Sequence, residues 1–133
     1  MVVIIPCYNE QDNVEWVVDS LIENYPEYDY VVVNDGSLDS TASICRENGY
    51  NLLDLPINLG LAAAIQTGMR YALRKDYDYA IQLDGDGQHD PRYIETMVAE
   101  IESKSCDMVI GSRFLYKKKP KSVRMTGSNI IQI

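Results

Sequence analysis

The sequence predicts an α/β fold in which helices cover both faces of a mostly parallel β-sheet. Five short apolar runs, typical of strands that are buried on both faces, alternate with segments whose apolar residues recur at helical spacing. Strands that alternate with helices in this way form parallel sheets, because each right-handed crossover helix packs back onto the sheet. The chain has 133 residues, which suits one domain with a hydrophobic core.

The first strand is predicted over residues 2–6, where the run VVIIP ends in a proline. A helix follows and ends before Pro26, because proline disfavours helix in the residue before it. The apolar positions of this helix are Val14, Val17, Val18 and Leu21. The run YVVVN at residues 30–34 predicts a second buried strand. A short helix should follow, with Asp39 or Ser40 as its N-cap and Gly49 at its end.

The run NLLDL at residues 51–55 indicates a third, weaker strand. The next helix is predicted over residues 60–74, because apolar side chains recur there every four residues. These apolar positions are Leu61, Ile65, Met69 and Leu73. The helix is also rich in small residues, namely Ala62, Ala63, Ala64 and Gly68, which would let it approach the sheet closely.

A fourth strand is predicted over residues 79–83 (YAIQL) and a fifth over residues 107–111 (DMVIG). Between them, Asp90 and Pro91 have the character of an N-cap and a first helical residue. The helical stripe that follows is Ile94, Met97, Val98 and Ile101. After residue 111 the pattern stops, and residues 130–133 look like an unfinished helix, so we expect the front part of a larger domain.

The charge of the chain is unevenly distributed. The overall net charge of −8 argues against nucleic acid as a partner. Residues 1–112 carry a net charge of −14, whereas residues 113–133 carry +6. The basic side chains of this last part are Arg113, Lys117, Lys118, Lys119, Lys121 and Arg124. The basic segment 113–124 is interpreted either as a solvated loop or as a contact for anionic lipid or a lipid-linked phosphate.

Three widely spaced cysteines, Cys7, Cys45 and Cys106, form no CxxC pair, which fits reduced thiols. The N-terminus lacks the basic and apolar regions of a signal peptide. No apolar run approaches the roughly 20 residues that a membrane span needs. We therefore expect a cytoplasmic protein, peripheral at the inner face of the membrane if the basic segment binds lipid.

The loops after the strands indicate a small-molecule site, because ligands of open parallel sheets bind beyond the carboxyl ends of the strands. In order, these loops are CYNE (7–10), NDGSLDST (34–41), PINLG (56–60), DGDGQHD (84–90) and SRF (112–114). The second loop also fits a turn with a helix cap, and the third fits a capped helix N-terminus. A carboxylate at Asp35, right after a buried strand, needs a hydrogen-bond donor. Cys7 is interpreted as a packing residue.

The DGDG motif is the most specific feature of the sequence. Asp84 and Asp86 can point to one side of a turn that the neighbouring glycines permit. Two such carboxylates are typical ligands of Mg²⁺ or Mn²⁺, and the metal could bridge phosphate oxygens. Gln88 offers a neutral oxygen two residues later, and the lone loop histidine His89 could be a ligand but is more often a bystander.

Three other classes use similar residues. An EF-hand loop fits Asp84, Asp86, Gln88 and Glu95, but His89 stands where a glycine is needed. A phosphatase of the haloacid dehalogenase type uses the first aspartate of a DxD motif as a nucleophile, normally after the first strand rather than the fourth. A dinucleotide-binding domain needs GxGxxG after its first strand, where this chain has CYNEQD.

Together, the segments VVIIPCYNE, VVVNDGSLDST, NLGLAAAIQTG, LDGDGQHDP and GSRF resemble the inverting nucleotide-sugar glycosyltransferases with the GT-A fold. The nearest subgroup is the polyprenyl-phosphate hexosyltransferases, which include enzymes similar to dolichyl-phosphate mannose synthase. The resemblance covers residues 1 to about 114. It implies a Rossmann-like three-layer sandwich of the nucleotide-diphospho-sugar transferase type, truncated here after the fifth strand.

The resemblance also implies roles for individual residues. Its nucleotide-sugar-binding positions correspond to Pro6, Tyr8, Glu10, Asp35, Asn58, Gly60, Asp84 and Asp86, among which Asp35 would bind the base. Its metal ligands correspond to Asp84, Asp86 and Gln88. Asp84 and Asp86 would also serve catalysis, together with Arg113, which follows Ser112 in the segment near the donor sugar and the acceptor phosphate.

The implied activity is metal-dependent transfer of a hexose, with inversion, from a UDP- or GDP-sugar to an acceptor such as a polyprenyl phosphate, in cell-envelope or glycolipid synthesis. Residues 1–114 would form the donor-binding part, and residues 115–133 a basic loop and the start of an incomplete acceptor side. Two alternatives stay open: a DxD phosphatase with Asp84 as its nucleophile, and a catalytically silent nucleotide-sugar-binding module. Apolar surface left by the unfinished helix also predicts self-association.

Overall fold

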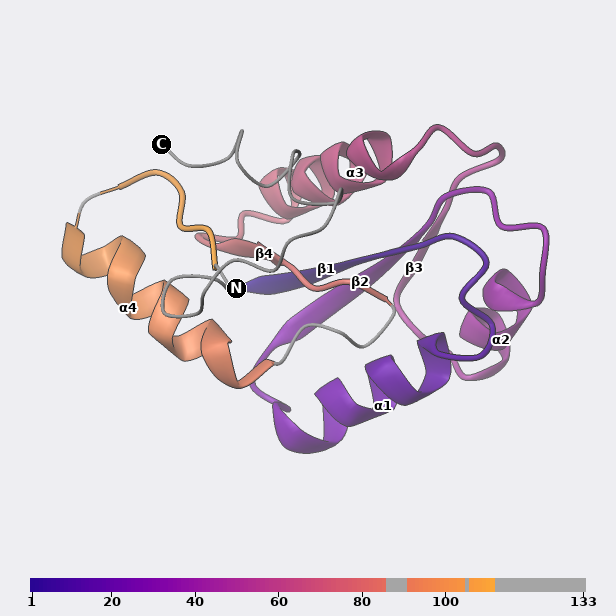
Figure 1. The fold of residues 1–133 in the computed structure, drawn as a ribbon, viewed down its shortest axis with the longest axis horizontal. Coiled ribbons are helices and arrows are strands. Elements are labelled where there is room, and N and C mark those ends of the chain that lie inside the picture. Colours follow the sequence, from indigo (N-terminus) through magenta and orange to yellow (C-terminus); the bar gives the residue numbers. More distant parts are fainter. Residues whose placement is uncertain (86–90, 105, 112–133) are drawn as a thin grey trace, which may run out of the picture.

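The computed structural model describes residues 1–85, 91–104 and 106–111, and within these ranges four parallel strands form one sheet (Figure 1). The strands are β1 (Val2–Cys7), β2 (Asp29–Asn34), β3 (Leu52–Asp54) and β4 (Ala80–Gln82). Their order is β3-β2-β1-β4, so β1 is paired on both sides. β1 and β2 pair over six residues, from Val2 opposite Asp29 to Cys7 opposite Asn34, and therefore end at the same edge.

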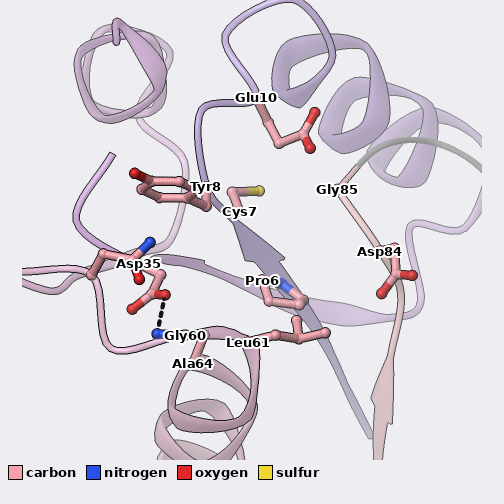
Figure 2. A pocket seen from close by; sticks show the side chains of 11 residues that line it. Pro6, Cys7, Tyr8, Glu10, Asp35, Gly60, Leu61, Ala64, Asp84 and Gly85 are labelled. Atoms are coloured by element: carbon pink, nitrogen blue, oxygen red, sulfur yellow. Dashed lines mark hydrogen bonds between the residues drawn. The ribbon is translucent and has the colours of Figure 1, made fainter. Parts of the chain in front are cut away.

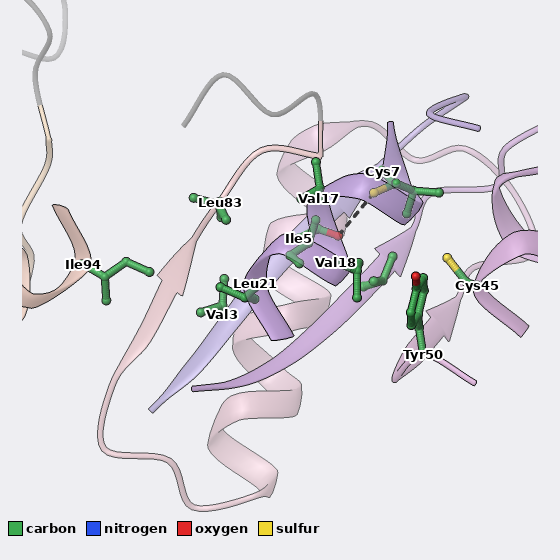
Figure 3. Packing of buried hydrophobic residues seen from close by; sticks show 12 residues of the cluster. Val3, Ile5, Cys7, Val17, Val18, Leu21, Cys45, Tyr50, Leu83 and Ile94 are labelled. Carbon is green, nitrogen blue, oxygen red and sulfur yellow. Dashed lines mark hydrogen bonds between the residues drawn. The ribbon is translucent and has the colours of Figure 1, made fainter. Parts of the chain in front are cut away.

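The helices lie on both faces of this sheet, as Figure 1 shows. They are α1 (Val14–Asn24), α2 (Thr41–Glu47), α3 (Leu61–Arg74) and α4 (Ile94–Lys104), with a 3₁₀ turn at Pro91–Tyr93 before α4. Side chains of α1, α2 and α4 share a core cluster with Val3 and Ile5 of β1 (Figure 3). α3 packs against the other face, on Val2 and Ile4. The three-layer α/β arrangement predicted from the sequence is therefore confirmed.

The early helices follow their sequence patterns closely. The buried residues of α1 are the four predicted ones, Val14, Val17, Val18 and Leu21. At the start of α2, the capping side chain is Asp39, because its Oδ1 accepts the backbone N–H of Thr41 at 2.9 Å. Ser40 makes no such side-chain bond. Gly49 follows α2 with φ 69°, in the left-handed region that glycine adopts without strain.

α3 faces the sheet with its small residues. Its buried positions are Ala64, Gly68 and Ala72, whereas the large side chains of Leu61, Met69 and Leu73 are exposed. A Cβ atom at Gly68 would overlap the side chain of Ile4. The predicted close approach of this helix to the sheet is thus present.

The predicted fifth strand is wrong, because residues 107–111 form no strand. Met108 and Ile110 are exposed, at 74% and 60%. A strand needs a neighbour for its backbone N–H and C=O groups, and in the described part of the chain β4 is the outer strand of the sheet with no further strand beside it. An apolar run predicts burial, but it does not by itself provide the neighbouring strand that a β-strand needs.

The start of α4 also differs from the prediction. Pro91 lies in the 3₁₀ turn and α4 begins at Ile94, three residues later than expected. Ile94 is buried and Val98 packs against the same core cluster, so the predicted apolar stripe does face the sheet. The predicted N-cap, Asp90, lies outside the described residues.

Within the described ranges, none of the helices combines the length and the apolar character needed to cross a membrane.

Candidate functional site at the carboxyl ends of the strands

A pocket of about 340 Å³ lies at the carboxyl ends of β1, β2 and β4 (Figure 2). Seven of the predicted site residues line it: Pro6, Tyr8, Glu10, Asp35, Asn58, Gly60 and Asp84. They come from four separate segments of the sequence, which the parallel sheet brings to one edge. Four further lining residues are Cys7, Leu61, Ala64 and Gly85.

The loop after β1 is held in place by hydrogen bonds to the loop after β2. Asn9 adopts φ 55°, which turns the chain sharply between Tyr8 and Glu10. Its backbone N–H donates to Ser37 Oγ at 2.9 Å, and its Oδ1 accepts the N–H of Leu38 at 2.9 Å. These bonds hold Asn9, and hence the backbone between the pocket residues Tyr8 and Glu10.

A second pair of bonds extends the same contact. The N–H of Glu10 donates to Thr41 Oγ1 at 2.9 Å, at the first residue of α2. The N–H of Gln11 donates to Asp39 Oδ2 at 3.1 Å. Partial burial alone would raise the pKa of the Asp39 carboxyl group, but hydrogen bonds from Thr41 and Gln11 together outweigh it and lower the pKa. Asp39 is therefore ionised at neutral pH and serves as an acceptor in the loop structure.

Asp35 joins β2 to the start of α3. It is 2% exposed, and its two carboxylate oxygens accept the backbone N–H groups of Leu59 at 2.9 Å and Gly60 at 2.8 Å. Its own N–H donates to the carbonyl of Cys7 at 2.9 Å. The donor that the sequence required for Asp35 is therefore the loop 56–60, and the carboxylate lies at the positive end of the α3 dipole.

Gly36 allows these two loops to touch. Its φ is 62°, and a Cβ atom there would overlap the backbone of Ile57 and Asn58. A side chain at this position would push the loop 56–60 away from Asp35. Glycine in the sequence NDGS therefore serves two purposes: it permits the turn, and it lets the loop 56–60 approach Asp35.

Asn34, the last residue of β2, hydrogen-bonds to residues on both sides of this edge of the sheet. It is buried, its Nδ2 donates to Asp54 Oδ1 at 2.6 Å, and its Oδ1 accepts hydrogen bonds from the hydroxyl and backbone N–H of Ser37. Asp54 also forms an ion pair with Arg46 of α2. The network links β2, β3 and α2 to the loop that contacts Asn9, and hence to the pocket wall.

Asp84 lies across the pocket from Tyr8 and Asp35, at the end of β4 (Figure 2). Its Oδ1 accepts a hydrogen bond from Gln82 Nε2 at 2.8 Å. The next residue, Gly85, packs so closely on β1 that a Cβ atom would lie 2.6 Å from Cys7 Sγ. Gly85 therefore brings the β4 loop against the end of β1.

The pocket lining is acidic. It contains the carboxylates of Glu10, Asp35 and Asp84 and no lysine, arginine or histidine among the described residues. An anionic ligand bound among the described lining residues would face these three carboxylates. In the part of the chain that the structure describes, no cluster of three or more His, Cys, Asp or Glu side chains is arranged to hold a metal.

Several predicted site residues cannot be placed. Asp86, Gln88, His89 and Arg113 lie outside the described residues, as does the basic segment 113–124. Their roles stay predictions. Asp84 is thus the one predicted metal ligand whose position the structure describes.

Cys7, which the sequence predicts to be a packing residue, packs in the core cluster and also lines the pocket. It is 2% exposed, and burial raises the pKa of its thiol far above the usual value. The thiol therefore stays protonated, and we assign it no nucleophilic role.

Leu61 and Ala64 also line the pocket, although the sequence analysis did not predict them as site residues. Their i, i+3 spacing right after the loop 56–60 places them on one side of the first turn of α3.

Comparisons with known proteins agree with this fold. Residues 2–131 match the family described as glycosyl transferase family 2. The chain is 30% identical over 119 residues to polyprenol monophosphomannose synthase of Mycolicibacterium smegmatis, covering 85% of this chain and 44% of that protein. It is 32% identical over 140 residues to the UDP-N-acetylglucosamine–dolichyl-phosphate N-acetylglucosaminyltransferase of Methanococcus voltae, covering 92% of this chain and 55% of that protein. The chain thus spans about half the length of these relatives.

Two solved structures show the same fold. TarS 1–349 of S. aureus, crystallised with UDP, superimposes with a TM-score of 0.62 at 23% identity, over 91% of this chain and 38% of that one. Glucosyl-3-phosphoglycerate synthase of Mycobacterium tuberculosis, with Mn²⁺, UDP and glucosyl-3-phosphoglycerate, gives 0.59 at 22% identity, over 75% of this chain and 38% of that one. These neighbours confirm the predicted GT-A type of α/β fold. Since the family match extends over nearly the whole sequence, this chain belongs to glycosyl transferase family 2.

Proposed function

We propose that this chain is the donor-binding part of a glycosyltransferase that transfers a hexose from a UDP- or GDP-sugar, with inversion and with a divalent cation. The observation that carries the proposal is that seven predicted site residues, from four separate segments, line one pocket. Family membership supports a sugar transferase, and the names of the relatives support sugar transfer to a lipid phosphate.

The geometry favours one orientation of the donor. Tyr8 and Asp35 lie on one side of the pocket and Asp84 on the other (Figure 2). The Asp35 carboxylate already occupies the anion-binding position at the N-terminus of α3, so it would repel a diphosphate there. We therefore place the nucleoside beside Tyr8 and Asp35, and the diphosphate towards Asp84.

A cation is needed for this orientation, because the lining carries three carboxylates and no described basic residue. Mg²⁺ or Mn²⁺ suits such oxygen ligands. Asp84, together with Asp86 and Gln88, would hold it. When bound, it would offset the negative charge that develops on the departing diphosphate.

The acceptor attacks the anomeric carbon from the face opposite the diphosphate, which inverts that centre. A phosphate acceptor is already anionic and needs mainly positioning, whereas a hydroxyl acceptor needs a general base. We assign positioning of a phosphate acceptor to Arg113. A lipid-linked acceptor would place the protein at the inner face of the membrane, with the basic segment 113–124 against anionic headgroups.

Calorimetric titration of the chain with UDP and with GDP, each with and without Mn²⁺, tests the proposal. We expect binding of at least one nucleotide that depends on Mn²⁺ and that Asp84→Asn weakens at least tenfold. Asp78→Asn, at an exposed aspartate, is the matched control. Absence of Mn²⁺-dependent binding to either nucleotide, or an Asp84→Asn variant that binds as well as the wild type, would refute it.

Incubation with UDP- and GDP-sugars separates this proposal from its alternatives. Sugar transfer or donor hydrolysis by the chain excludes a catalytically silent binding module. A phosphatase would form a phosphorylated Asp84, which fluoroberyllate would mimic. Membership of glycosyl transferase family 2 favours sugar transfer over this alternative.

A further inference from the structure

Gln82, the last residue of β4, lies directly beside the acidic pocket residue Asp84. Side chains two residues apart along an extended chain point to the same face of the sheet. Ala80 packs in the core cluster on the α3 face, whereas Leu83 packs in the cluster on the opposite face. By this alternation Gln82 and Asp84 share the α3 face, and Gln82 Nε2 donates to Asp84 Oδ1 at 2.8 Å.

The backbone of Gln82 is anchored in the sheet. Its Cα pairs with that of Ile4 in the parallel register, and the N–H of Leu83 donates to the carbonyl of Ile4 at 2.9 Å. β1, which carries Ile4, is one of the two inner strands of the sheet. The backbone from which the half-buried side chain of Gln82 extends is therefore held at a fixed position relative to β1.

The presence of an amide at this position needs an explanation. The strand run YAIQL is otherwise apolar apart from its first tyrosine, and Gln82 is opposite a fully buried isoleucine. A half-buried amide costs free energy unless it is hydrogen-bonded. Asp84 supplies the partner, so the two residues form a unit at the end of β4.

We infer that Gln82 is a positioning residue that orients the carboxylate of Asp84 for a divalent cation. The inference rests on the proposed function, in which Asp84 is a cation ligand. Because the amide is neutral, it fixes the rotation of the carboxylate without cancelling its charge, whereas a lysine or arginine there would compete with the cation. Loss of such a supporting hydrogen bond typically lowers metal affinity about 10–100-fold.

The test is Gln82→Met, which keeps the length of the side chain and removes its hydrogen-bonding groups. Gln66→Met makes the same change at an exposed position of α3 and is the matched control. The apparent Kd for Mn²⁺ is measured by electron paramagnetic resonance with UDP present, and the thermal midpoint is measured without Mn²⁺. We expect Gln82→Met to raise the Kd for Mn²⁺ at least tenfold, to bind UDP normally once Mn²⁺ is saturating, and to leave the metal-free thermal midpoint nearly unchanged.

Two other variants make the result decisive. Gln82→Asn keeps the amide but shortens the side chain by one methylene, so it should also weaken Mn²⁺ binding, and it replaces Gln82→Met if that variant fails to fold. Gln82→Glu adds a carboxylate beside Asp84. Tighter Mn²⁺ binding by Gln82→Glu would identify position 82 as a place for a direct ligand and overturn the positioning role.

The outcomes also separate this inference from the proposed function. A wild-type chain that binds Mn²⁺ with UDP, together with Gln82→Met and Gln82→Asn variants that bind it within twofold of the wild type, would overturn the inference alone. A wild-type chain that binds no Mn²⁺ with UDP would overturn the proposed function and the inference together.

Discussion

The backbone N–H of Gly60 donates to the carboxylate of Asp35 at 2.8 Å, across 25 residues of sequence (Figure 2). With the parallel bond from Leu59, it ties the loop before α3 to the end of β2. One buried side chain thereby sets the distance between two walls of the pocket. The pocket is thus a product of side-chain-to-backbone contacts between loops as well as of strand order.

Asp35→Ala should both destabilise the fold and abolish nucleotide binding. The change leaves the N–H groups of Leu59 and Gly60 without their acceptor, which costs about 1–3 kcal/mol of unfolding free energy. Urea unfolding measures the loss, and calorimetric titration with UDP and Mn²⁺ measures the binding. Asp78→Ala, at an exposed position, should change neither. Unaltered UDP affinity in Asp35→Ala would mean that this carboxylate does not shape the binding site.

Asn34→Asp should destabilise the protein in a pH-dependent way. The new carboxylate would face Asp54, whose Oδ1 lies 2.6 Å from the Asn34 amide nitrogen, so the pKa of the new group would be raised. At pH 7 the repulsion should cost roughly 3 kcal/mol. As the pH falls through this raised pKa, the group becomes a donor to Asp54 and the difference from the wild type should shrink. Urea unfolding of both proteins at pH 7 and pH 5 checks this, and a constant difference would contradict it.

Gly68→Ala should destabilise α3 although alanine is the better helix former. A methyl group there overlaps the side chain of Ile4, and overpacking of this kind costs about 1–3 kcal/mol, against a helix-propensity gain of up to about 1 kcal/mol. In a double-mutant cycle, Ile4→Ala should partly relieve the cost of the added methyl group. Additive unfolding free energies in the cycle would show that the two residues are not in contact.

The thiols should differ in reactivity. Cys7 and Cys45 are buried, whereas Cys106 is partly exposed, so a disulfide-exchange reagent at pH 8 should modify one thiol in the native chain and three in urea.

The buried thiols should also make stability depend on pH. Burial raises the pKa of Cys45 to about 11, and it also raises that of Cys7. Because the folded state disfavours both thiolates, unfolding free energy should fall as the pH rises from about 9 towards 11. Rapid native modification of all three thiols would contradict the buried positions.

The exposed apolar residues of α3 predict self-association. Met69 and Leu73 are 41% and 80% exposed on a helix that faces the sheet with its small residues instead. Light scattering of the wild type should show a mass above that of one chain, and the double variant Met69→Lys, Leu73→Lys should return it to the monomer. A wild-type chain that is monomeric at high concentration would contradict the prediction.

The strand and helix order was predictable because each element carries its own period. α1 is the clearest case, since the apolar residues at i, i+3, i+4 and i+7 are the ones that become buried. The failure at residues 107–111 has an equally physical cause, because a strand depends on a neighbour that its own residues do not encode. α3 was predictable as a helix, but the close fit of Gly68 on Ile4 becomes visible only when both are placed.

The candidate site was predictable to a similar degree. Parallel strands deliver their following loops to one edge, so Tyr8, Asp35 and Asp84 line one pocket although they are far apart in sequence. The partners of these residues were not predictable. The sequence pattern alone does not pair Asp35 with the backbone of Leu59, or Gln82 with Asp84.

The central claim is that a nucleoside diphosphate binds in this pocket through a cation held by Asp84. A crystal structure of the chain grown with UDP and Mn²⁺, with the manganese located by its anomalous signal, tests it most directly. The account predicts manganese within about 2.3 Å of a carboxylate oxygen of Asp84, the diphosphate on the manganese, and the base beside Tyr8 and Asp35. Manganese away from Asp84, or UDP bound outside the pocket, would contradict it.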